Sequence, residues 1–255
     1  MLNIILSGCN GYMGRVVTEI VANDPAATII AGIDINSEKH SDYPVFATPD
    51  EILSDNLIDK ADVIIDFSAT SAIDGLLNLS ISKKVPIILC VTGYTVPQLA
   101  QIEEASKHVA VFRSGNMSIG INLLADLIKR ACAVLGEDFD IEIVERHHRR
   151  KVDAPSGTAL MLADAATSAL QYEPEYVYER ESKREPRKTH EIGISAIRGG
   201  TIVGEHDVIF AGQDEIIELT HTASSRDVFA TGAIKAAKYM ASKQPGMYDM
   251  SDVLK

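Results

Sequence analysis

The 255-residue sequence predicts an α/β protein in two parts: an open parallel sheet flanked by helices, and an α+β domain with a mixed or antiparallel sheet. Two observations predict the parallel sheet. Short apolar segments recur along the first half of the chain, and stretches of helical length separate them, which favours parallel pairing through right-handed crossovers. A third observation predicts the second sheet, because apolar and polar residues alternate over residues 139–145 with the period of a half-buried strand.

The first half of the chain contains five predicted strands. Residues 2–7 are an apolar run that ends at a glycine, as expected for a strand buried on both faces. Apolar residues then recur at helical spacing over residues 13–21. The same alternation continues with strands at 28–33, 62–68, 86–92 and 109–114, and with helices near 71–83 and 95–106.

A glycine-rich turn joins the first strand to the first helix. Gly8, Gly11 and Gly14 have the spacing GxxGxxG, and Asn10 stands where the commoner pattern has its second glycine. Glycines here permit a tight turn and close approach of the backbone to a pyrophosphate at the positive end of the helix. Asp34 ends the second strand, 20 residues after Gly14, where a carboxylate can accept hydrogen bonds from a ribose diol. Three glycines alone also fit an ordinary strand–helix turn, but the combination predicts a Rossmann-like dinucleotide-binding domain.

Small or polar residues follow the later strands of this domain. Open α/β sheets bind ligands at the carboxyl ends of their strands, so Ser68, Thr92 and Asn116 are candidates for the binding edge. Cys9 lies inside the glycine turn, where we interpret it as a small residue that the turn tolerates and not as a redox thiol.

Composition excludes several classes of protein. The formal net charge is −12, from 24 basic and 36 acidic residues, so we expect no nucleic-acid partner and no anionic membrane, which both require a broad basic face. No apolar run is long enough to span a bilayer, and the amino terminus does not resemble a cleavable signal. The three scattered cysteines fit reduced thiols in the cytoplasm and lack the close pairing of a zinc site, so we expect no metal.

The second half changes pattern. A long helix is predicted over 117–135, and residues 157–170 form a second helix that Ser156 is well placed to cap. Residues 171–190 are charged and contain two prolines, which indicates a surface excursion. Three further strands, at 192–200, 201–212 and 214–223, are expected to join residues 139–145 in one sheet, followed by a helix from residue 227.

The segment "ERHHRRKVDAPSGTA" (145–159) is the most unusual in the second half. His147 and His148 point to opposite faces if the strand continues, so they should not share a role. One of them could donate a proton, because imidazole titrates near neutral pH. Lys151 comes near His147 only if the chain turns.

The end of this segment opens a helix. The first amides of this helix, at Ser156, Gly157 and Thr158, can bind a carboxylate, and together with imidazole and ammonium groups they suit a small substrate with one or more carboxylates. Arg149 and Arg150 are interpreted as solvated neighbours. No catalytic role is assigned to the histidines without such neighbours, His190, His206 and His221.

These motifs resemble one known family. "GCNGYMGR", "ERHHRRKVDAPSGTA", "IRGGTIVGEH" and "LTHTASSRDVFATGA" are similar to segments of the bacterial-type 4-hydroxy-tetrahydrodipicolinate reductases, formerly called dihydrodipicolinate reductases, over essentially the whole chain. The resemblance implies that NADH or NADPH gives a hydride to an unsaturated cyclic imine dicarboxylate of lysine and diaminopimelate biosynthesis, and that a proton is added beside it. It also implies a cytoplasmic homotetramer, with residues 1–116 and 227–255 binding the dinucleotide and residues 117–226 binding substrate and forming the subunit interface.

The resemblance also assigns site residues. His147 matches the general acid, and Lys151 matches a second catalytic residue that assists protonation and holds a substrate carboxylate. His148, Gly157 and Thr158 match substrate contacts. The cofactor-binding segments match Gly8, Cys9, Asn10, Gly11, Tyr12, Met13, Asp34, Cys90, Val91, Thr92, Ser114, Gly115, Asn116 and Met117.

Two departures from the family pattern concern the cofactor. "CVTG" stands in place of a sequence closer to "GTTG", which leaves the contacts of Cys90 and Val91 open. Ile35 follows Asp34, where some members have an arginine for the 2′-phosphate of NADPH, although Lys39 could compensate. Because Asp34 favours a free ribose diol and repels a phosphate, we expect NADH to work at least as well as NADPH.

Two alternatives remain open. The chain could be another nicotinamide-dependent dehydrogenase of amino or keto dicarboxylates, or a protein that senses a dinucleotide without turnover. The presence of both His147 and Lys151 argues against the second alternative, because binding alone does not require an acid.

Overall fold

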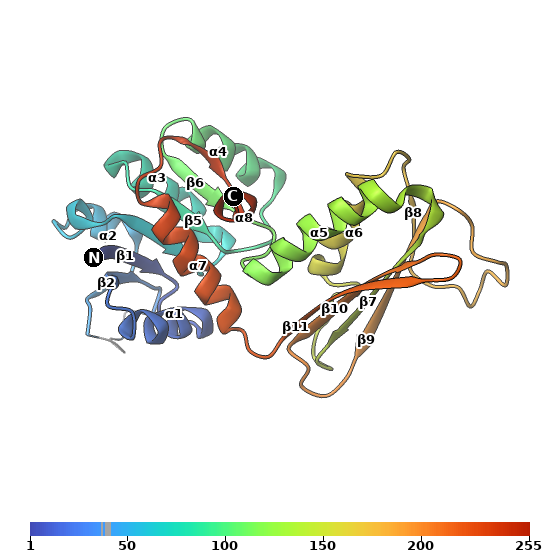
Figure 1. Ribbon diagram of the computed structural model, residues 1–255. Helices are drawn as coiled ribbons and strands as arrows, with labels where there is room; N and C mark the ends of the chain where they lie inside the picture. The colour runs from blue at the N-terminus through green and yellow to red at the C-terminus, as the bar shows by residue number, and fades with distance from the viewer. Residues whose placement is uncertain (37, 39–41) are drawn as a thin grey trace. The chain divides into compact units, whose positions relative to one another are not determined.

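A computed structural model describes residues 1–36, 38 and 42–255 (Figure 1). The chain divides into two compact units, Met1–Ser118 with Asp227–Lys255, and Ile119–Arg226. No helix in the described ranges is both long and apolar enough to cross a membrane.

The first unit is built on one parallel sheet. In the described part of the chain it has seven strands, in the order β12-β6-β5-β4-β1-β2-β3, and every neighbouring pair is parallel. This confirms the predicted open α/β sheet. Two edge strands, β3 and β12, were not predicted, because two or three residues are too few to show a period. The strands are β1 (Leu2–Ser7), β2 (Ala27–Ile33), β3 (Val45–Phe46), β4 (Val63–Asp66), β5 (Ile87–Leu89), β6 (Ala110–Arg113) and β12 (Gly246–Tyr248).

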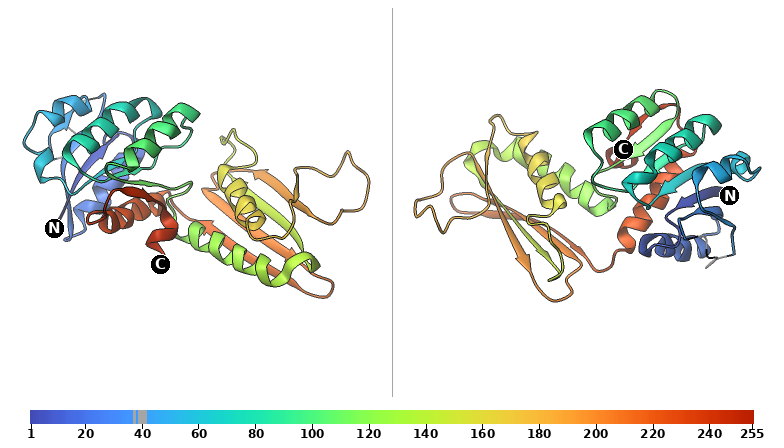
Figure 2. Two further views of the ribbon diagram at one scale, coloured as in Figure 1. Left: turned by 90° about the horizontal axis from the view of Figure 1, so that it is seen from above. Right: turned by 180° about the vertical axis from the view of Figure 1, so that it is seen from behind.

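Helices cover both faces of this sheet (Figure 2). Helices α1 and α7 pack together, and α7 also contacts β4, β5 and β6, while α3 packs against α2 and α4 on the opposite face. Strands β1, β4 and β5 are fully buried at their centres, as their continuous apolar runs predict. The helices are α1 (Tyr12–Ala22), α2 (Pro49–Leu53), α3 (Ile73–Lys83), α4 (Val96–Ser106), α7 (Asp227–Met240) and α8 (Met250–Val253).

The second unit contains a mixed sheet, in the order β11-β10-β7-β9-β8. Strand β10 is antiparallel to both β7 and β11, whereas β9 is parallel to both β7 and β8. Helices α5 and α6 pack against each other, and with the inward strand residues they form a separate apolar core. The elements are α5 (Ile119–Leu135), β7 (Asp140–His147), α6 (Gly157–Thr167), β8 (Glu175–Val177), β9 (Glu191–Arg198), β10 (Gly204–Ala211) and β11 (Ile216–Ala223).

The other face of the mixed sheet is formed by the strand residues that alternate with the core residues. We call this the open face. It carries Val144, Ile197, Ile209 and Ile216 together with charged side chains, and Ile197 and Ile216 are 46% and 65% exposed. The open face therefore combines exposed apolar side chains with charged ones, and exposed apolar surface can mark a contact site.

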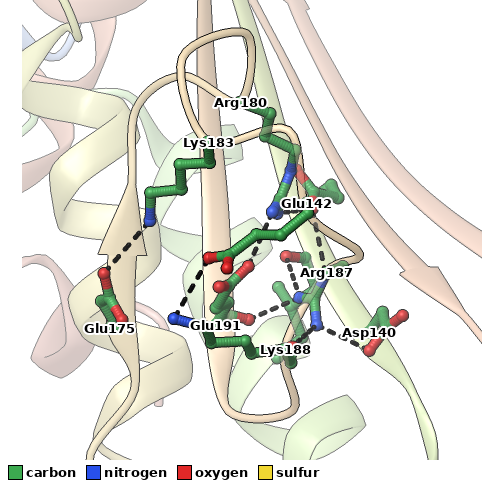
Figure 3. A network of polar contacts seen from close by, with 10 residues as sticks. Asp140, Glu142, Glu175, Arg180, Lys183, Arg187, Lys188 and Glu191 are labelled. Atoms are coloured by element: carbon green, nitrogen blue, oxygen red, sulfur yellow. Dashed lines mark hydrogen bonds and ion pairs between the residues drawn. The ribbon is translucent and has the colours of Figure 1, made fainter.

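Residues 171–190 were expected to be a surface excursion, but part of this segment pairs with the sheet as the edge strand β8. The rest is tied down by charge. Arg180 donates to Glu142 and Glu191 at 2.7 Å each, and Arg187 donates to Glu142 at 3.2 Å (Figure 3). The charged composition of this segment therefore serves ion pairs across β7 and β9 as well as solvation.

Candidate functional site

The glycine turn after β1 is closely packed. Gly8 has a φ of +76°, and a Cβ at this position would lie 2.7 Å from the backbone of Phe67 and Ser68. A Cβ on Gly14 would lie 2.1 Å from the carbonyl oxygen of Gly8. Helix α1 starts at Tyr12 without a side-chain cap, so its first turn has the form that binds a phosphate. Side chains at Gly8 or Gly14 would destroy this loop.

Asn10 and Asp34 connect the turn to the end of β2. The backbone N–H of Asn10 donates to Asp34 Oδ2 at 2.9 Å, and that of Asn36 donates to Asp34 Oδ1 at 3.0 Å. The Asn10 carboxamide donates to the carbonyl oxygens of Asn36 and Glu38. Ile35 is 99% exposed, and Lys39 lies outside the described residues. The asparagine at the second-glycine position thus ties the turn to Asp34, Asn36 and Glu38.

Cys9 is a packing residue. The Cys9 side chain fills the space beside Gly32, and a Cβ on Gly32 would lie 2.5 Å from the Cys9 sulfur. Burial raises the pKa of the Cys9 thiol to about 11. A thiol that is buried and protonated is a poor nucleophile, which agrees with the interpretation made from the sequence.

The carboxyl ends of β4 and β5 carry a second buried group. Asp66 is fully buried at the end of β4, and burial raises its pKa although Ser68 donates to Oδ1. The backbone N–H of Cys90 donates to the carbonyl oxygen of Asp66 at 3.0 Å, and burial raises the pKa of the Cys90 thiol as well. Contacts made at "CVTG" would accordingly use its backbone.

The segment 114–117 turns between β6 and α5. Ser114 Oγ donates to the carbonyl oxygen of Asn116, whose side chain accepts from the N–H of Ser118. Met117 is buried, and its carbonyl oxygen would be 1.7 Å from a Cβ on Gly232 of α7. The sequence-predicted cofactor residues of the first unit are buried at Gly8, Cys9 and Met117, half-buried at Asn10, Met13, Asp34, Cys90, Val91, Ser114 and Asn116, and exposed at Gly11, Tyr12, Thr92 and Gly115.

In the second unit, His147 is the last residue of β7 and is only 9% exposed. Its Nδ1 lies 2.6 Å from Oε2 of Glu145, a fully buried carboxylate. Arg198 donates to both Glu145 oxygens at 2.7 Å, and the backbone N–H of Ser156 donates to Oε1 at 2.9 Å. We call Glu145, His147, Ser156 and Arg198 the Glu145 cluster.

Burial and hydrogen bonds within the Glu145 cluster shift the pKa values of Glu145 and His147. Burial by itself would raise the pKa of Glu145, but the hydrogen bonds from Arg198, His147 and the Ser156 amide outweigh it and lower that pKa. Burial lowers the pKa of His147, and the charges of Lys151 and Arg198 act in the same direction, whereas Glu145 opposes them. Glu145 is therefore ionised, and His147 Nδ1 donates to it.

His206 packs against this cluster from β10. Its ring meets the His147 ring edge-on at a centroid distance of 5.2 Å, and its Nε2 lies 3.1 Å from Ser156 Oγ. Ser156 caps α6, as expected, and accepts from the N–H of Ala159 at 3.1 Å. Burial, with a contribution from His147, lowers the pKa of His206 to about 4, so this ring is neutral at ordinary pH.

The chain turns directly after His147. The N–H of Lys151 donates to the carbonyl oxygen of His148, so the chain makes the turn that the sequence alone leaves undecided. The Lys151 ammonium lies 2.9 Å from the Asp153 carboxylate. His148 Nδ1 is buried and has no hydrogen-bond partner among the described residues, while Nε2 lies 3.4 Å from Arg226 Nη2. Gly157 and Thr158 begin α6.

The remaining residues of the segment are separated from these contacts. Arg149 and Arg150 are exposed, as interpreted from the sequence. Arg146 pairs with Asp207 and Glu205. All three side chains lie on the open face, because they alternate along β7 and β10 with the residues that face the core. No group of three or more His, Cys, Asp or Glu side chains suited to a metal ion occurs among the described residues.

Comparisons with known proteins cover the whole chain. Family models described as "Dihydrodipicolinate reductase, N-terminus" and "Dihydrodipicolinate reductase, C-terminus" match residues 2–117 and 120–254. The chain belongs to the dihydrodipicolinate reductase family. This confirms the resemblance that the motifs indicate.

Individual relatives agree with the family match. The 4-hydroxy-tetrahydrodipicolinate reductase of Caldanaerobacter subterraneus subsp. tengcongensis is 50% identical, over 100% of this chain and 99% of that protein. The enzyme of the same name from Clostridium novyi is 49% identical with the same coverage. A dipicolinate-bound dihydrodipicolinate reductase from Paenisporosarcina sp. TG-14 shares the fold, with a TM-score of 0.81 at 22% identity, over 98% of this chain and 97% of that one.

Three residues near His147 in this family member were not assigned a role from the sequence: Glu145, Arg198 and His206. A signal for Glu145 existed, because the alternation that places Ile141 and Ile143 inward also places Glu145 inward, and a carboxylate on a buried face needs partners. Arg198 and His206 had no such signal, since only the pairing of β7 with β9 and β10 brings them to this position.

The burial of neutral His206 predicts a dependence of stability on pH. Between pH 6.5 and 4 the His206 ring is protonated in the unfolded chain but stays neutral in the folded chain. The free energy of unfolding therefore falls as the pH falls toward 4. The contribution is at most about 3 kcal/mol over this interval. Urea unfolding at several pH values should show a smaller loss of stability on acidification in His206→Gln than in the wild type. Equal slopes in the wild type and in His206→Gln would contradict the prediction.

Proposed function

We propose that this protein catalyses the reduction of 4-hydroxy-tetrahydrodipicolinate (dihydrodipicolinate) to tetrahydrodipicolinate with NADH or NADPH, in lysine and diaminopimelate biosynthesis. The observation that carries the proposal is a buried histidine held by an ionised carboxylate directly beside a helix start that can bind an anion. Relatives about half identical over their full length carry the name of this activity.

The first unit is proposed to bind the dinucleotide. The residues fit that group, because the close backbone packing at Gly8 and Gly14 makes a tight turn directly before the start of α1, and Asp34 is held beside the turn by the Asn10 amide. When bound there, a reduced nicotinamide supplies a hydride. The segments at Cys90–Thr92 and Ser114–Met117 are proposed to complete this site.

The second unit, Ile119–Arg226, is proposed to bind the substrate. The first amides of α6, at Gly157 and Thr158, would donate hydrogen bonds to one carboxylate. His148 Nδ1, Lys151 and the nearby Arg226 supply further donors for a dicarboxylate. A small molecule with two carboxylates would therefore be recognised through several charge-assisted hydrogen bonds.

His147 is proposed as the general acid, with Lys151 assisting. The Nδ1 of His147 is committed to Glu145, so Nε2 is the atom that would donate the proton. Burial and nearby cations lower the pKa of His147 in the free protein. Substrate carboxylates beside the ring would raise that pKa again, because negative charge favours the imidazolium. Substrate binding would thus load the acid with its proton.

A homotetramer is proposed, assembled through the open face of the second unit. Its occupant would be a second copy of this chain, since this face carries the exposed Ile197 and Ile216 together with the ion pairs of Arg146 with Glu205 and Asp207, a mixture of apolar and charged groups that a symmetric copy can complement. The proposed compartment is the cytoplasm, which agrees with three free cysteines.

The activity is tested by mixing the protein with a reduced nicotinamide cofactor and the product of dihydrodipicolinate synthase. We expect loss of the reduced-nicotinamide absorbance. His147→Gln should lower kcat about 10²- to 10³-fold with little change in KM, because a proton donor matters mainly in the transition state. His190→Gln should retain activity. No oxidation by folded wild-type protein would refute the function, and an unchanged kcat in His147→Gln would remove His147 from its role.

Cofactor preference is tested by steady-state kinetics. We expect kcat/KM with NADH to equal or exceed that with NADPH, because the Asp34 carboxylate repels a 2′-phosphate and exposed Ile35 offers no cation. Asp34→Asn removes that repulsion and should raise the relative efficiency of NADPH. A strong wild-type preference for NADPH would contradict this reading of Asp34.

Assembly is tested by light scattering during size-exclusion chromatography. The wild type should elute as a tetramer, and Ile197→Asp, which places a charge on the open face, should yield smaller species. Val134→Asp is the matched control, since Val134 is 83% exposed on α5 of the same unit. A monomeric wild type, or equal behaviour of the two variants, would overturn the proposed interface.

A further inference from the structure

The carboxylate of Glu145 is fully buried, yet each of its oxygens accepts two hydrogen bonds from protein groups. Oε2 accepts from His147 Nδ1 and Arg198 Nη1, and Oε1 accepts from the Ser156 N–H and Arg198 Nη2. Arg198 also donates to the carbonyl oxygen of Asp153. Burying a charge in this way is costly unless every lone pair finds a partner, so the arrangement calls for a reason beyond packing.

One consequence of this arrangement concerns the tautomer of His147. An ionised carboxylate only accepts hydrogen bonds, so the proton of the neutral ring must sit on Nδ1. The lone pair of the neutral ring, and the transferable proton of the imidazolium, are then both on Nε2. Gly204 lies on that side, and because a Cβ there would be only 3.1 Å from Nε2, a side chain at this position would crowd the donating atom.

A second consequence concerns helix α6. The Ser156 N–H that binds Glu145 belongs to the residue that caps this helix, one position before Gly157. A single side chain therefore fixes both the imidazole and the helix start. The distance between the proposed acid and the amides proposed for the substrate carboxylate is set by Glu145.

We propose that Glu145 is a positioning residue for proton transfer, and that Arg198 holds it in place. Glu145 keeps His147 with Nε2 as the donating atom and holds that atom in register with the start of α6. The inference rests on the proposed function, in which His147 is the acid. When the proton leaves Nε2 for the substrate, His147 becomes neutral and keeps its hydrogen bond to Glu145, so Glu145 remains ionised throughout and solvent restores the proton.

The tautomer is measured without turnover. Nitrogen-15 NMR of the imidazole side chains, with the His147 signals assigned by their loss in His147→Gln, distinguishes the two tautomers. Above the pKa of His147 the wild type should carry its proton on Nδ1. Glu145→Gln should lose that preference, since a carboxamide can present either a donor or an acceptor. A wild-type ring protonated on Nε2 would overturn the inference, whatever the activity.

The kinetic test compares two isosteric variants. Glu145→Gln should lower kcat about 10²-fold, as expected for an acid that is misplaced or in the wrong tautomer, and should change KM less. Glu191→Gln is the matched control: Glu191 is 3% exposed, pairs with Arg180 (Figure 3) and belongs to the same sheet, but it is not among the groups that face His147. It tests what the loss of any buried, arginine-paired carboxylate does. Glu145→Asp keeps the charge and should recover part of kcat.

The pH profile adds a readout that a merely structural role would not move. The groups facing His147 are Glu145, Arg198, Lys151 and His206, and of these only Glu145 favours the protonated ring. Activity that requires protonated His147 falls as the pH rises. In Glu145→Gln this alkaline fall should begin at lower pH, and in Glu191→Gln it should stay at its wild-type position.

The outcomes separate the two proposals. If folded wild-type protein does not oxidise the cofactor with the cyclic substrate, the function fails, and the NMR result still decides the placement of His147. If the wild type is active and Glu145→Gln loses no more kcat than Glu191→Gln, the positioning role fails and the function stands. If Glu145→Gln does not fold, as judged by circular dichroism, Arg198→Lys replaces it. This variant keeps the charge but loses the two-nitrogen contact, so it should lower kcat and shift the alkaline fall in the same direction, and wild-type behaviour would overturn the inference.

Discussion

A carboxylate that is wholly removed from water must be surrounded by donors, and in the second unit the donors to Glu145 come from three different elements. Arg198 ends β9, Ser156 caps α6, and His147 ends β7. Loss of any one partner would leave part of a buried charge uncompensated, which is strongly destabilising. The end of β7, the end of β9 and the start of α6 therefore form one rigid group, and the proposed chemistry uses atoms that this group fixes.

The first unit depends on a different constraint, which is the absence of side chains. Gly8 and Gly14 approach neighbouring backbone more closely than any Cβ allows, so the shape of the turn excludes other residues at both positions. Asn10 occupies the place of the usual second glycine without disturbing this packing. Its side chain instead donates hydrogen bonds to the carbonyl oxygens of Asn36 and Glu38. The turn therefore keeps its shape although its sequence departs from the common glycine pattern.

The sequence predicted long or periodic features and missed short or non-local ones. The strands with continuous apolar runs and the inward alternation of β7 were visible, because burial imposes a period. Strands β3, β8 and β12 have two or three residues each and show none. At the site, local chemistry pointed to the pair His147 and His148 and to the start of α6, and the family resemblance assigned the catalytic roles to His147 and Lys151. Arg198 and His206 lie more than fifty residues away along the chain, and only strand register brings them to His147.

The basic residues of the segment 145–159 have separate electrostatic environments. Arg146 is neutralised on the open face, and Arg149 and Arg150 lie in solvent. Lys151 pairs with Asp153, whose side chain is 59% exposed, so this acid can return to water at little cost when a substrate carboxylate takes its place. Glu145 cannot be displaced in this way, because it is fully buried and both of its oxygens accept hydrogen bonds from protein groups. In the proposed mechanism an exposed acid is exchanged for substrate while a buried acid keeps the proton donor in position, and this division would let a strongly acidic chain bind a small dianion.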